Sequence, residues 1–283
     1  MKTHIMCAWL LAVGLIALLS ATAVAMEKAY VKDGEIWTKK NGTGNAVQLT
    51  RDGKAKALVG TSPDGRRIAY FVTGNQQDKS ESTVVILDQQ GHKLSEFRPN
   101  ESEGTPYVSI NSAEWIDNAQ LGMECHVNPS MSSYLVADAS TGKTKQNYLG
   151  FNFVWSPDKH ALAHVGQMVH FAPWPHSEYV QLNDKTVYPK GGAVYGDDKV
   201  KVHTFVGAFT WSPDGRNVAV LDALSGKEKG AELVLISLGG KVTVKKLPIK
   251  DESSCKDLLL KWESQTRISV RGKNCQLTVD TES

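Results

Sequence analysis

A turn motif of the form Ser-Pro-Asp-Gly recurs along this 283-residue chain, and it constrains the fold more than any other feature. Each copy runs directly into an apolar segment, such as the one that begins at Ile68. Repetition at intervals of tens of residues indicates an array of similar supersecondary units. The three clearest copies are Ser62, Pro63, Asp64 and Gly65; Trp155, Ser156, Pro157, Asp158 and Lys159; and Trp211, Ser212, Pro213, Asp214 and Gly215.

Each residue type in the motif suits a tight turn between two strands. Proline presets φ for the first central position, aspartate bonds its own backbone, and glycine accepts the positive φ that returns the chain. Tryptophan before the turn supplies a large apolar surface for packing between sheets. Weaker copies follow Trp115 and Trp262, and Thr61 takes the tryptophan position in the first copy. The five anchors lie 40 to 56 residues apart, which favours a propeller with unequal loops, and we assign the motif structural roles.

Short apolar and β-branched runs dominate the rest of the sequence, and helix patterns are almost absent. The runs are separated by Gly, Asp, Asn, Ser or Pro, as expected for strands joined by tight turns. Each unit is predicted to contain an inner strand, the turn, a second strand and an outer hairpin, which is the four-stranded meander of a propeller blade. The predicted hairpin turns are Asp33-Gly34, Gln90-Gly91, Thr141-Gly142 and Gly239-Gly240.

The expected fold is therefore an all-β, six-bladed β-propeller. About 258 residues follow residue 25, and a typical blade takes roughly 40 to 45 residues. Five inner-strand anchors are visible, and the strands between Ala29 and Thr50 supply most of a further unit. Five longer blades, the last one closed by those N-terminal strands, are the alternative.

Residues 1–25 have the pattern of a secretory signal peptide. Lys2 supplies positive charge, an apolar core runs from Ala8 to Leu19, and Ala23-Val24-Ala25 is a small-x-small cleavage pattern. We expect cleavage before Met26, a single propeller domain over residues 26–283, and a periplasmic or secreted protein. The apolar core is shorter than the about 20 residues of a membrane-spanning helix, and no later stretch is a candidate span.

Charge and cysteine content narrow the possible partners and crosslinks. A formal net charge of +2, with no lysine- or arginine-rich run, argues against a nucleic-acid partner.

Three cysteines follow the signal peptide, so at least one is unpaired within a monomer. Cys255 and Cys275 flank one predicted hairpin, and a disulfide there would stabilise the chain by about 3 kcal/mol. Neighbouring strands need not bring these positions within bonding range, so the pairing stays open. Cys125 is interpreted as a buried thiol.

One stretch of the chain resembles the repeat of the TolB-like β-propeller family. It runs from Gln48-Leu49-Thr50-Arg51-Asp52-Gly53 through an inner strand to Ser62-Pro63-Asp64-Gly65 and Ile68-Ala69-Tyr70. The resemblance covers nearly all of the chain after residue 26 and implies a propeller, a fold that unrelated activities share. Related repeats occur in the non-catalytic domains of prolyl oligopeptidases. No room is expected between Met26 and the first strand for the α/β domain of TolB, and a Gly-x-Ser-x-Gly hydrolase elbow is absent, so neither activity is carried over.

The candidate functional residues lie in a histidine-rich stretch that ends in a proline-broken loop. Exposed aromatic side chains are favoured contacts in protein interfaces, so this loop is predicted to bind a partner. The predicted contacts are His170, Phe171, Trp174 and His176. A second reading takes His164, His170 and His176 as metal ligands, although their spacing matches no familiar metal motif. No catalytic residue and no cofactor are predicted.

Two functions are compatible with these features. The first is a non-catalytic scaffold that binds a protein or a cell-envelope component through a propeller face. The alternative is a small propeller metalloenzyme, of the hydrolase or lactonase type, with His and Asp ligands in the central channel. An enzyme needs polar side chains from several blades to converge on one site. Because the histidines concentrate in one unit, the sequence favours the scaffold over the enzyme.

Overall fold

The computed structural model consists of β-strands, turns and loops, and its described part contains no helix. It describes residues 28–39, 44–72, 82–99, 109–128, 131–166, 173–197, 199–249, 258–272 and 275–281. The all-β class is confirmed. The signal-peptide segment lies outside the described residues, so its cleavage stays a prediction. No helix among the described residues is long and apolar enough to cross a membrane.

The first two sheets are simple antiparallel meanders. Sheet I has three strands, β1 (Tyr30–Lys32), β2 (Glu35–Lys39) and β3 (Ala46–Gln48). Sheet II has four strands, β4 (Lys56–Thr61), β5 (Arg67–Val72), β6 (Thr83–Asp88) and β7 (Lys93–Phe97). The predicted hairpins across Asp33-Gly34 and Gln90-Gly91 are confirmed by the pairing of β1 with β2 and of β6 with β7.

Sheet III joins two meanders through one long strand, β11. Its seven strands are β8 (Ser109–Trp115), β9 (Gln120–Asn128), β10 (Met131–Asp138), β11 (Thr144–Trp155), β12 (Leu162–Gly166), β14 (Val180–Leu182) and β15 (Lys185–Tyr188). The first half of β11 pairs with β10, and its second half pairs with β12. The strand changes partner at Gly150, where φ is +150° and a Cβ atom would lie 2.0 Å from the Val165 carbonyl oxygen. Only glycine fits this crossing.

Two further sheets and a short ribbon complete the described chain. Sheet IV contains β17 (Lys201–Trp211), β18 (Asn217–Gly226), β19 (Gly230–Ser237) and β20 (Val242–Leu247). Sheet V contains β21 (Leu259–Ser264), β22 (Arg267–Gly272) and β23 (Cys275–Asp280). The ribbon pairs β13 (His176–Ser177) with β16 (Val194–Tyr195).

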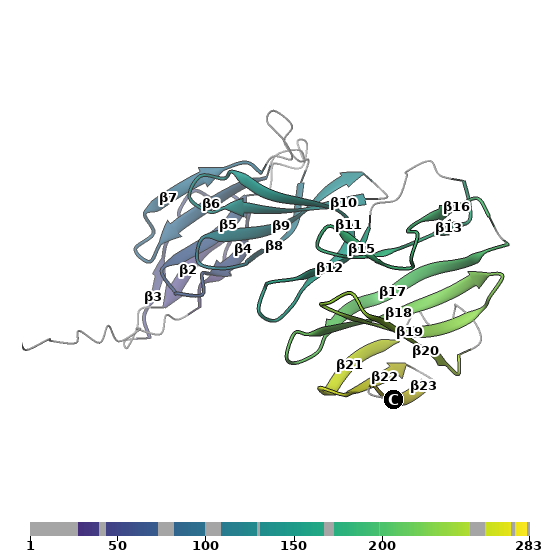
Figure 1. The fold of residues 1–283 in the computed structure, drawn as a ribbon. Helices are drawn as coiled ribbons and strands as arrows, with labels where there is room; N and C mark the ends of the chain where they lie inside the picture. Colours follow the sequence, from purple (N-terminus) through teal and green to yellow (C-terminus); the bar gives the residue numbers. More distant parts are fainter. Residues whose placement is uncertain are drawn as a thin grey trace, which may run out of the picture.

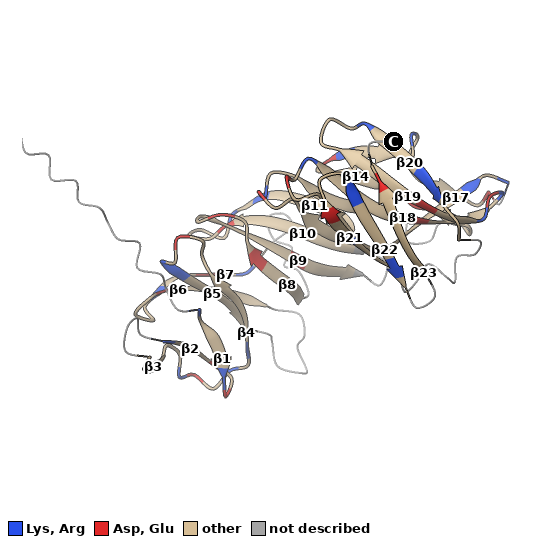
Figure 2. Ribbon diagram, turned by 90° about the horizontal axis from the view of Figure 1, so that it is seen from below, with Lys and Arg blue, Asp and Glu red and all other residues tan. Residues whose placement is uncertain are grey.

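The sheets follow one another in space in the order of the chain. Apolar clusters fill the spaces between sheets I and II, II and III, III and IV, and IV and V. Figures 1 and 2 show sheet I and sheet V well apart, at opposite ends of this row. No closed ring is seen in the described part of the chain. Because two meanders also share β11, the predicted count of six blades is not confirmed and stays a prediction.

The three Ser-Pro-Asp motifs form the predicted turns. In the third copy the Ser212 hydroxyl donates to Asp214 Oδ1 at 2.6 Å and accepts the backbone N–H of Asn217 at 3.0 Å. The first and second copies repeat both contacts. The fourth position has positive φ in every copy: +74° at Gly65, +60° at Lys159 and +69° at Gly215. Lys159 therefore adopts a conformation that glycine accepts more readily.

The tryptophan of the motif forms a hydrogen bond to the preceding sheet. Each indole N–H donates, at 3.0 Å, to a backbone carbonyl on the inner strand of that sheet, and the acceptor directly precedes the equivalent anchor position. The pairs are Trp115 with Gly60, Trp211 with Val154, and Trp262 with Thr210. The three rings are buried within the intersheet clusters, so the predicted packing role is confirmed. The repeated hydrogen bond sets the register of one sheet on the next.

Two anchors depart from this pattern. Trp155 donates its indole N–H to the hydroxyl of Tyr134, within its own sheet, at 2.8 Å. Its unit is already held to the preceding one by the shared strand β11, which pairs with β10 on one side and with β12 on the other. Thr61, which replaces tryptophan, has a buried hydroxyl that forms no hydrogen bond with the described residues.

Sheets I and II are instead connected by a buried ion pair. Lys56 Nζ lies 3.0 Å from Glu35 Oε2, and it also contacts Asp52 and accepting backbone carbonyls. Burial opposes the charge of Lys56, but the contacts with Asp52 and Glu35 raise its pKa overall. Breaking such a pair by removing one partner would leave an uncompensated buried charge.

The cysteine predictions have different outcomes. Cys125 is fully buried and unpaired, and burial raises the pKa of its thiol to about 12, so its assignment as a buried thiol is confirmed. Cys255 lies outside the described residues, and its disulfide with Cys275 stays a prediction.

We predict that Trp211→Phe lowers the free energy of unfolding by about 1 kcal/mol, because it keeps an aromatic ring but removes the donor to the Val154 carbonyl. Chemical denaturation monitored by circular dichroism would measure the change. Trp37→Phe is the control, since its indole donates at 3.2 Å within one exposed hairpin. Equal effects of the two substitutions would contradict a special role for the intersheet bond.

Candidate functional site

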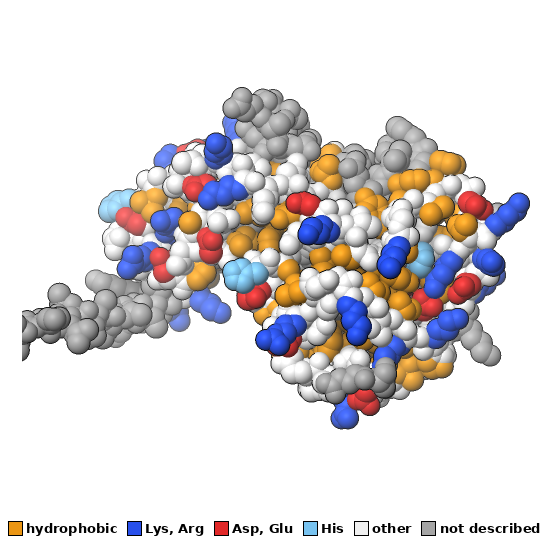
Figure 3. Space-filling view, in the orientation of Figure 1, with side chains coloured by type: hydrophobic (Ala, Val, Ile, Leu, Met, Phe, Trp, Pro, Cys, Tyr) orange, Lys and Arg blue, Asp and Glu red, His pale blue; other side chains and the backbone are white. Residues whose placement is uncertain are grey.

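The ribbon of β13 and β16 presents three aromatic rings close together. Trp174 directly precedes Pro175 and β13, and 80% of its surface is exposed. Its ring stacks on His176 with a centroid distance of 4.2 Å and an interplanar angle of 6°. Tyr195, the cross-strand partner of His176, approaches the imidazole edge-on at 5.8 Å. Figure 3 shows hydrophobic side chains gathered over the ribbon on this face. The stack holds a large apolar ring in solvent in one orientation.

The structure brings together two of the four residues predicted to contact a partner. Trp174 and His176 form the stack, whereas His170 and Phe171 lie outside the described residues. His164 does not belong to this surface. It is buried on β12, with its ring nitrogens 3.2 Å from the Val165 carbonyl oxygen and 2.9 Å from that of Asn183. Because both nitrogens face the backbone, His164 is a core histidine and not a metal ligand.

Three hydrogen bonds attach the ribbon to β17 of sheet IV. The backbone N–H of His203 donates to Ser177 Oγ at 3.1 Å, and the N–H of Glu178 donates to the His203 carbonyl at 2.8 Å. The Phe205 N–H then donates to Glu178 Oε2 at 2.7 Å. Ser177 is 1% exposed, so its hydroxyl serves this junction and is not accessible to a substrate. The ribbon is thereby held in a defined position on the sheet.

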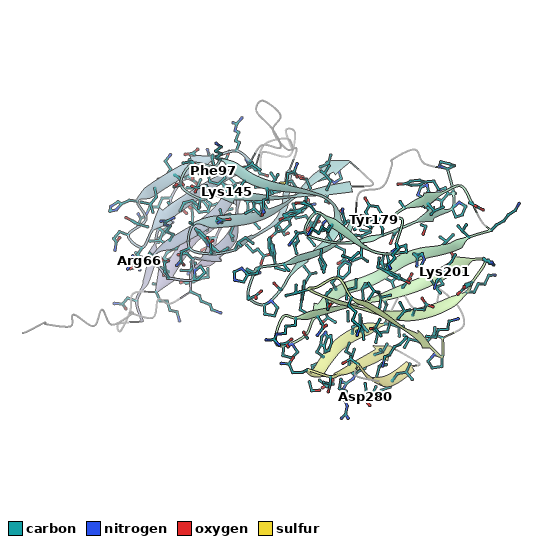
Figure 4. All side chains as sticks on the ribbon, in the orientation of Figure 1. Arg66, Phe97, Lys145, Tyr179, Lys201 and Asp280 are labelled. Atoms are coloured by element: carbon teal, nitrogen blue, oxygen red, sulfur yellow. The ribbon has the colours of Figure 1, made fainter. Side chains whose placement is uncertain are left out.

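A cluster of buried polar residues, the acid–histidine cluster, lies directly behind this junction. His203 Nδ1 is 2.6 Å from Asp222 Oδ2, and Tyr188 Oη lies 3.4 Å from Asp222 and 3.5 Å from Glu232. Lys201 Nζ pairs with Glu232 at 2.8 Å, and Figure 4 marks Lys201 near the start of β17. The carboxylates of Asp222 and Glu232 are 0% and 3% exposed. Strands β15, β17, β18 and β19 therefore contribute to one cluster.

Burial dominates the electrostatics of the acids. It raises the pKa of Glu178 to about 7, against the effect of the Phe205 hydrogen bond, and the charge of Asp222 acts in the same direction as burial. Burial also raises the pKa of Asp222, although the nearby His203 opposes this shift. The pKa of Tyr188 is raised by burial and by the two carboxylates, so its hydroxyl stays protonated. The Glu178 carboxyl group, which attaches the ribbon to β17, therefore changes its protonation state near neutral pH.

Ser177 of the ribbon lies beside His203 and Asp222 of the cluster, but the geometry of these three residues is that of an anchor. Ser177 Oγ contacts the backbone N–H of His203, whereas a nucleophile would contact the imidazole ring of the base. Among the described residues, no group of three or more His, Cys, Asp or Glu side chains is arranged to hold a metal ion. Figure 2 shows basic and acidic residues mixed over the described strands.

Most of the acid–histidine cluster was missed by the sequence analysis. A usable signal was present, since Asp222 and Glu232 interrupt the apolar runs of two strands that are otherwise buried. Charged residues inside such strands require partners. Their pairing with Tyr188, Lys201 and His203 depends on the register of four strands, which the composition of single strands does not reveal.

Comparison with known proteins identifies no family for this chain. No protein-family description and no curated protein sequence matches the chain. The chain is similar to the β-propeller domain of the Trilobed protease from Pyrococcus furiosus, with 12% identity over 88% of this chain and 76% of that one, at a TM-score of 0.44. Similarity to TolB from Acinetobacter baumannii has 13% identity over 92% and 65% of the two chains, at a TM-score of 0.35. Similarity to the Dos1 propeller has 9% identity over 88% of this chain and 63% of that one, at a TM-score of 0.46.

We predict that Glu178→Gln changes the pH dependence of stability. A folded-state pKa of about 7, above the ordinary value of 4.5, means that the folded protein binds more protons than the unfolded one between these values. The free energy of unfolding of the natural protein should therefore contain a contribution that falls as pH rises from about 4.5 to 7. The variant lacks this contribution. The free energy of unfolding of the variant minus that of the natural protein should therefore be roughly 2 kcal/mol more positive at pH 8 than at pH 5. Urea denaturation across this range measures the effect.

Glu263→Gln provides a control of opposite sign. A hydrogen bond from Ser269 lowers the pKa of Glu263, so its ionised form favours folding and the substitution should cost stability at neutral pH. A parallel response of the two variants would contradict the assignment of the raised pKa to Glu178.

Proposed function

We propose that this chain is a non-catalytic binding scaffold, exported to the periplasm or the medium, that docks a protein partner through the ribbon. The observation that carries the proposal is the Trp174–His176 stack. A tryptophan that is 80% exposed contributes little to folding, yet it can bury a large apolar surface when a partner covers it. Its position is set in advance by the stack and by the ribbon's three hydrogen bonds to β17.

Preorganisation supports a binding role for this surface. Ordering an exposed side chain on binding costs free energy, and this cost is smaller when the ring is already held. The stack of Trp174 on His176, with Tyr195 at its edge, orients the ring before any partner arrives. Tryptophan and tyrosine, which both pack against His176 on this small ribbon, are residue types enriched in interface hot spots. On this proposal, the six-bladed propeller of a TolB-like repeat protein serves as the rigid support of the ribbon.

We predict that Trp174→Ala weakens partner docking at least about tenfold without changing the melting temperature. A photoreactive amino acid placed at position 195, beside the stack, should give one discrete crosslinked adduct in envelope extracts. Excess unlabelled natural protein should compete with that adduct, and excess Trp174→Ala protein should not.

Leu259→Ala is the matched control, because Leu259 is 72% exposed on sheet V, away from the ribbon. It should compete as well as the natural protein. Equal competition by Trp174→Ala, or the same adducts from a photoreactive residue at position 259, would contradict docking through the ribbon.

Export is tested by the N-terminus of the protein. When the full chain is produced in a bacterial host, we expect a periplasmic product that begins at Met26, because Ala23-Val24-Ala25 fits a signal-peptidase site. Intact mass spectrometry of the periplasmic fraction would measure it. A product that keeps residues 1–25 and stays in the cytoplasm would contradict this part of the proposal.

A further inference from the structure

A polar cavity opens on sheet III, and none of its lining residues belongs to the ribbon or to the acid–histidine cluster. Its volume is about 380 Å³, within the range of roughly 300 to 1,000 Å³ typical of small-molecule sites. Three turns surround it: those after β8, between β11 and β12, and between β14 and β15. The lining residues are Ile116, Asp117, Gln120, Val136, Gln146, Tyr148, Trp155, Lys159, His160, Asn183 and Asp184.

Tyr148, on β11, provides an unused polar group in the wall of the cavity. The residue is 3% exposed, and its ring packs edge-on against Trp155 at 6.5 Å. Its hydroxyl makes no hydrogen bond to the described residues, and the residue lines the cavity. Burial and the charge of Asp184 raise the pKa of Tyr148 to about 12, so the hydroxyl stays a donor. Buried polar groups normally have partners, which suggests that a ligand or water supplies this one.

Further unused groups lie at the rim. Gln146, His160 and Asp184 are exposed, and their side chains make no hydrogen bond to the described residues. Two other charged groups are already engaged: Asp117 accepts backbone N–H groups of its own turn, and Lys159 pairs with Glu114. The groups left for a ligand are therefore a hydroxyl, an amide, an imidazole and one carboxylate.

This set of groups favours one ligand chemistry. The carboxylates of Asp117 and Asp184 disfavour an anion, and Lys159, the one Lys or Arg among the described lining residues, is neutralised by Glu114. Within this described lining, Asp184 is the one charged group without an ion pair or hydrogen bond, whereas most unused groups are neutral and can pair with hydroxyls that both donate and accept.

We propose that the cavity of sheet III binds a neutral saccharide of one or two rings, with Tyr148, Gln146 and Asp184 as its hydrogen-bonding contacts. The site is independent of docking through the ribbon. A saccharide here would connect three turns that come from two meanders of the same sheet, and would therefore also stabilise the fold by binding only the native state.

The test uses the mature chain with glucose, N-acetylglucosamine and maltose as neutral probes, and with glucuronic acid and glucosamine as charged ones. Saturation-transfer NMR and calorimetry should detect binding of at least one neutral probe at micromolar to millimolar affinity, and glucuronic acid should bind more weakly because it meets the carboxylates of Asp117 and Asp184. Tyr148→Phe and Asp184→Asn should each weaken that binding about tenfold. Tyr148→Phe removes only a hydroxyl that makes no hydrogen bond to the described part of the chain, so its melting temperature should match that of the natural protein.

Trp174→Ala is the control that separates the two proposals, since it alters the ribbon and should leave saccharide binding unchanged. Absence of binding by every neutral probe would overturn the inference. Tighter binding of glucuronic acid or of glucosamine than of every neutral probe would overturn the neutral ligand class, the first by contradicting the role of the carboxylates and the second by showing that Asp184 selects a cation. Binding that is insensitive to both Tyr148→Phe and Asp184→Asn would overturn the assigned site.

Discussion

The structure depends on a tryptophan hydrogen bond that is repeated from sheet to sheet. Trp115, Trp211 and Trp262 each insert an aromatic ring between two sheets and donate to a backbone carbonyl of the preceding inner strand. Apolar packing between sheets has no direction of its own, so it would tolerate sliding and rotation. A directional bond at a buried position removes this freedom, because a displaced ring would leave a buried donor unpaired. Sheets III, IV and V are each positioned in this way on the sheet that precedes them.

Where this bond is absent, another connection takes its place. Trp155 bonds within its own sheet, and there a continuous strand, β11, passes from one meander to the next through Gly150. At the first junction Thr61 replaces tryptophan, and a buried ion pair of Lys56 with Glu35 joins the sheets. The cavity of sheet III lies beside the fused junction, since its lining includes residues of both meanders around β11. A departure from the repeat therefore coincides with the candidate small-molecule site.

The ribbon shows how a surface feature depends on buried groups. Trp174 is displayed to solvent, but its position is set by Ser177 and Glu178, whose partners lie on β17. Behind them, His203 Nδ1 lies 2.6 Å from Asp222 Oδ2, and each of these buried polar groups needs the other as a hydrogen-bond partner. The exposed aromatic stack and the buried acids therefore form one continuous arrangement. A change in the protonation of Glu178 acts on the same segment that carries Trp174.

The sequence by itself determined the elements and their repetition. Ser-Pro-Asp turns, tight Gly-containing hairpins and short β-branched runs are local signals, and the strands formed where these signals stand. Trp174 and His176 were recognisable as surface residues for a similar reason, since prolines break the strand around them. Tertiary structure alone decided the fusion of two meanders through β11, the burial of His164, and the meeting of Tyr188, Lys201, His203, Asp222 and Glu232. These features depend on strand register and on contacts between residues far apart in the chain. Local propensity carries no information about either, because it acts over a few residues, whereas partners such as Tyr188 and Glu232 are 44 residues apart.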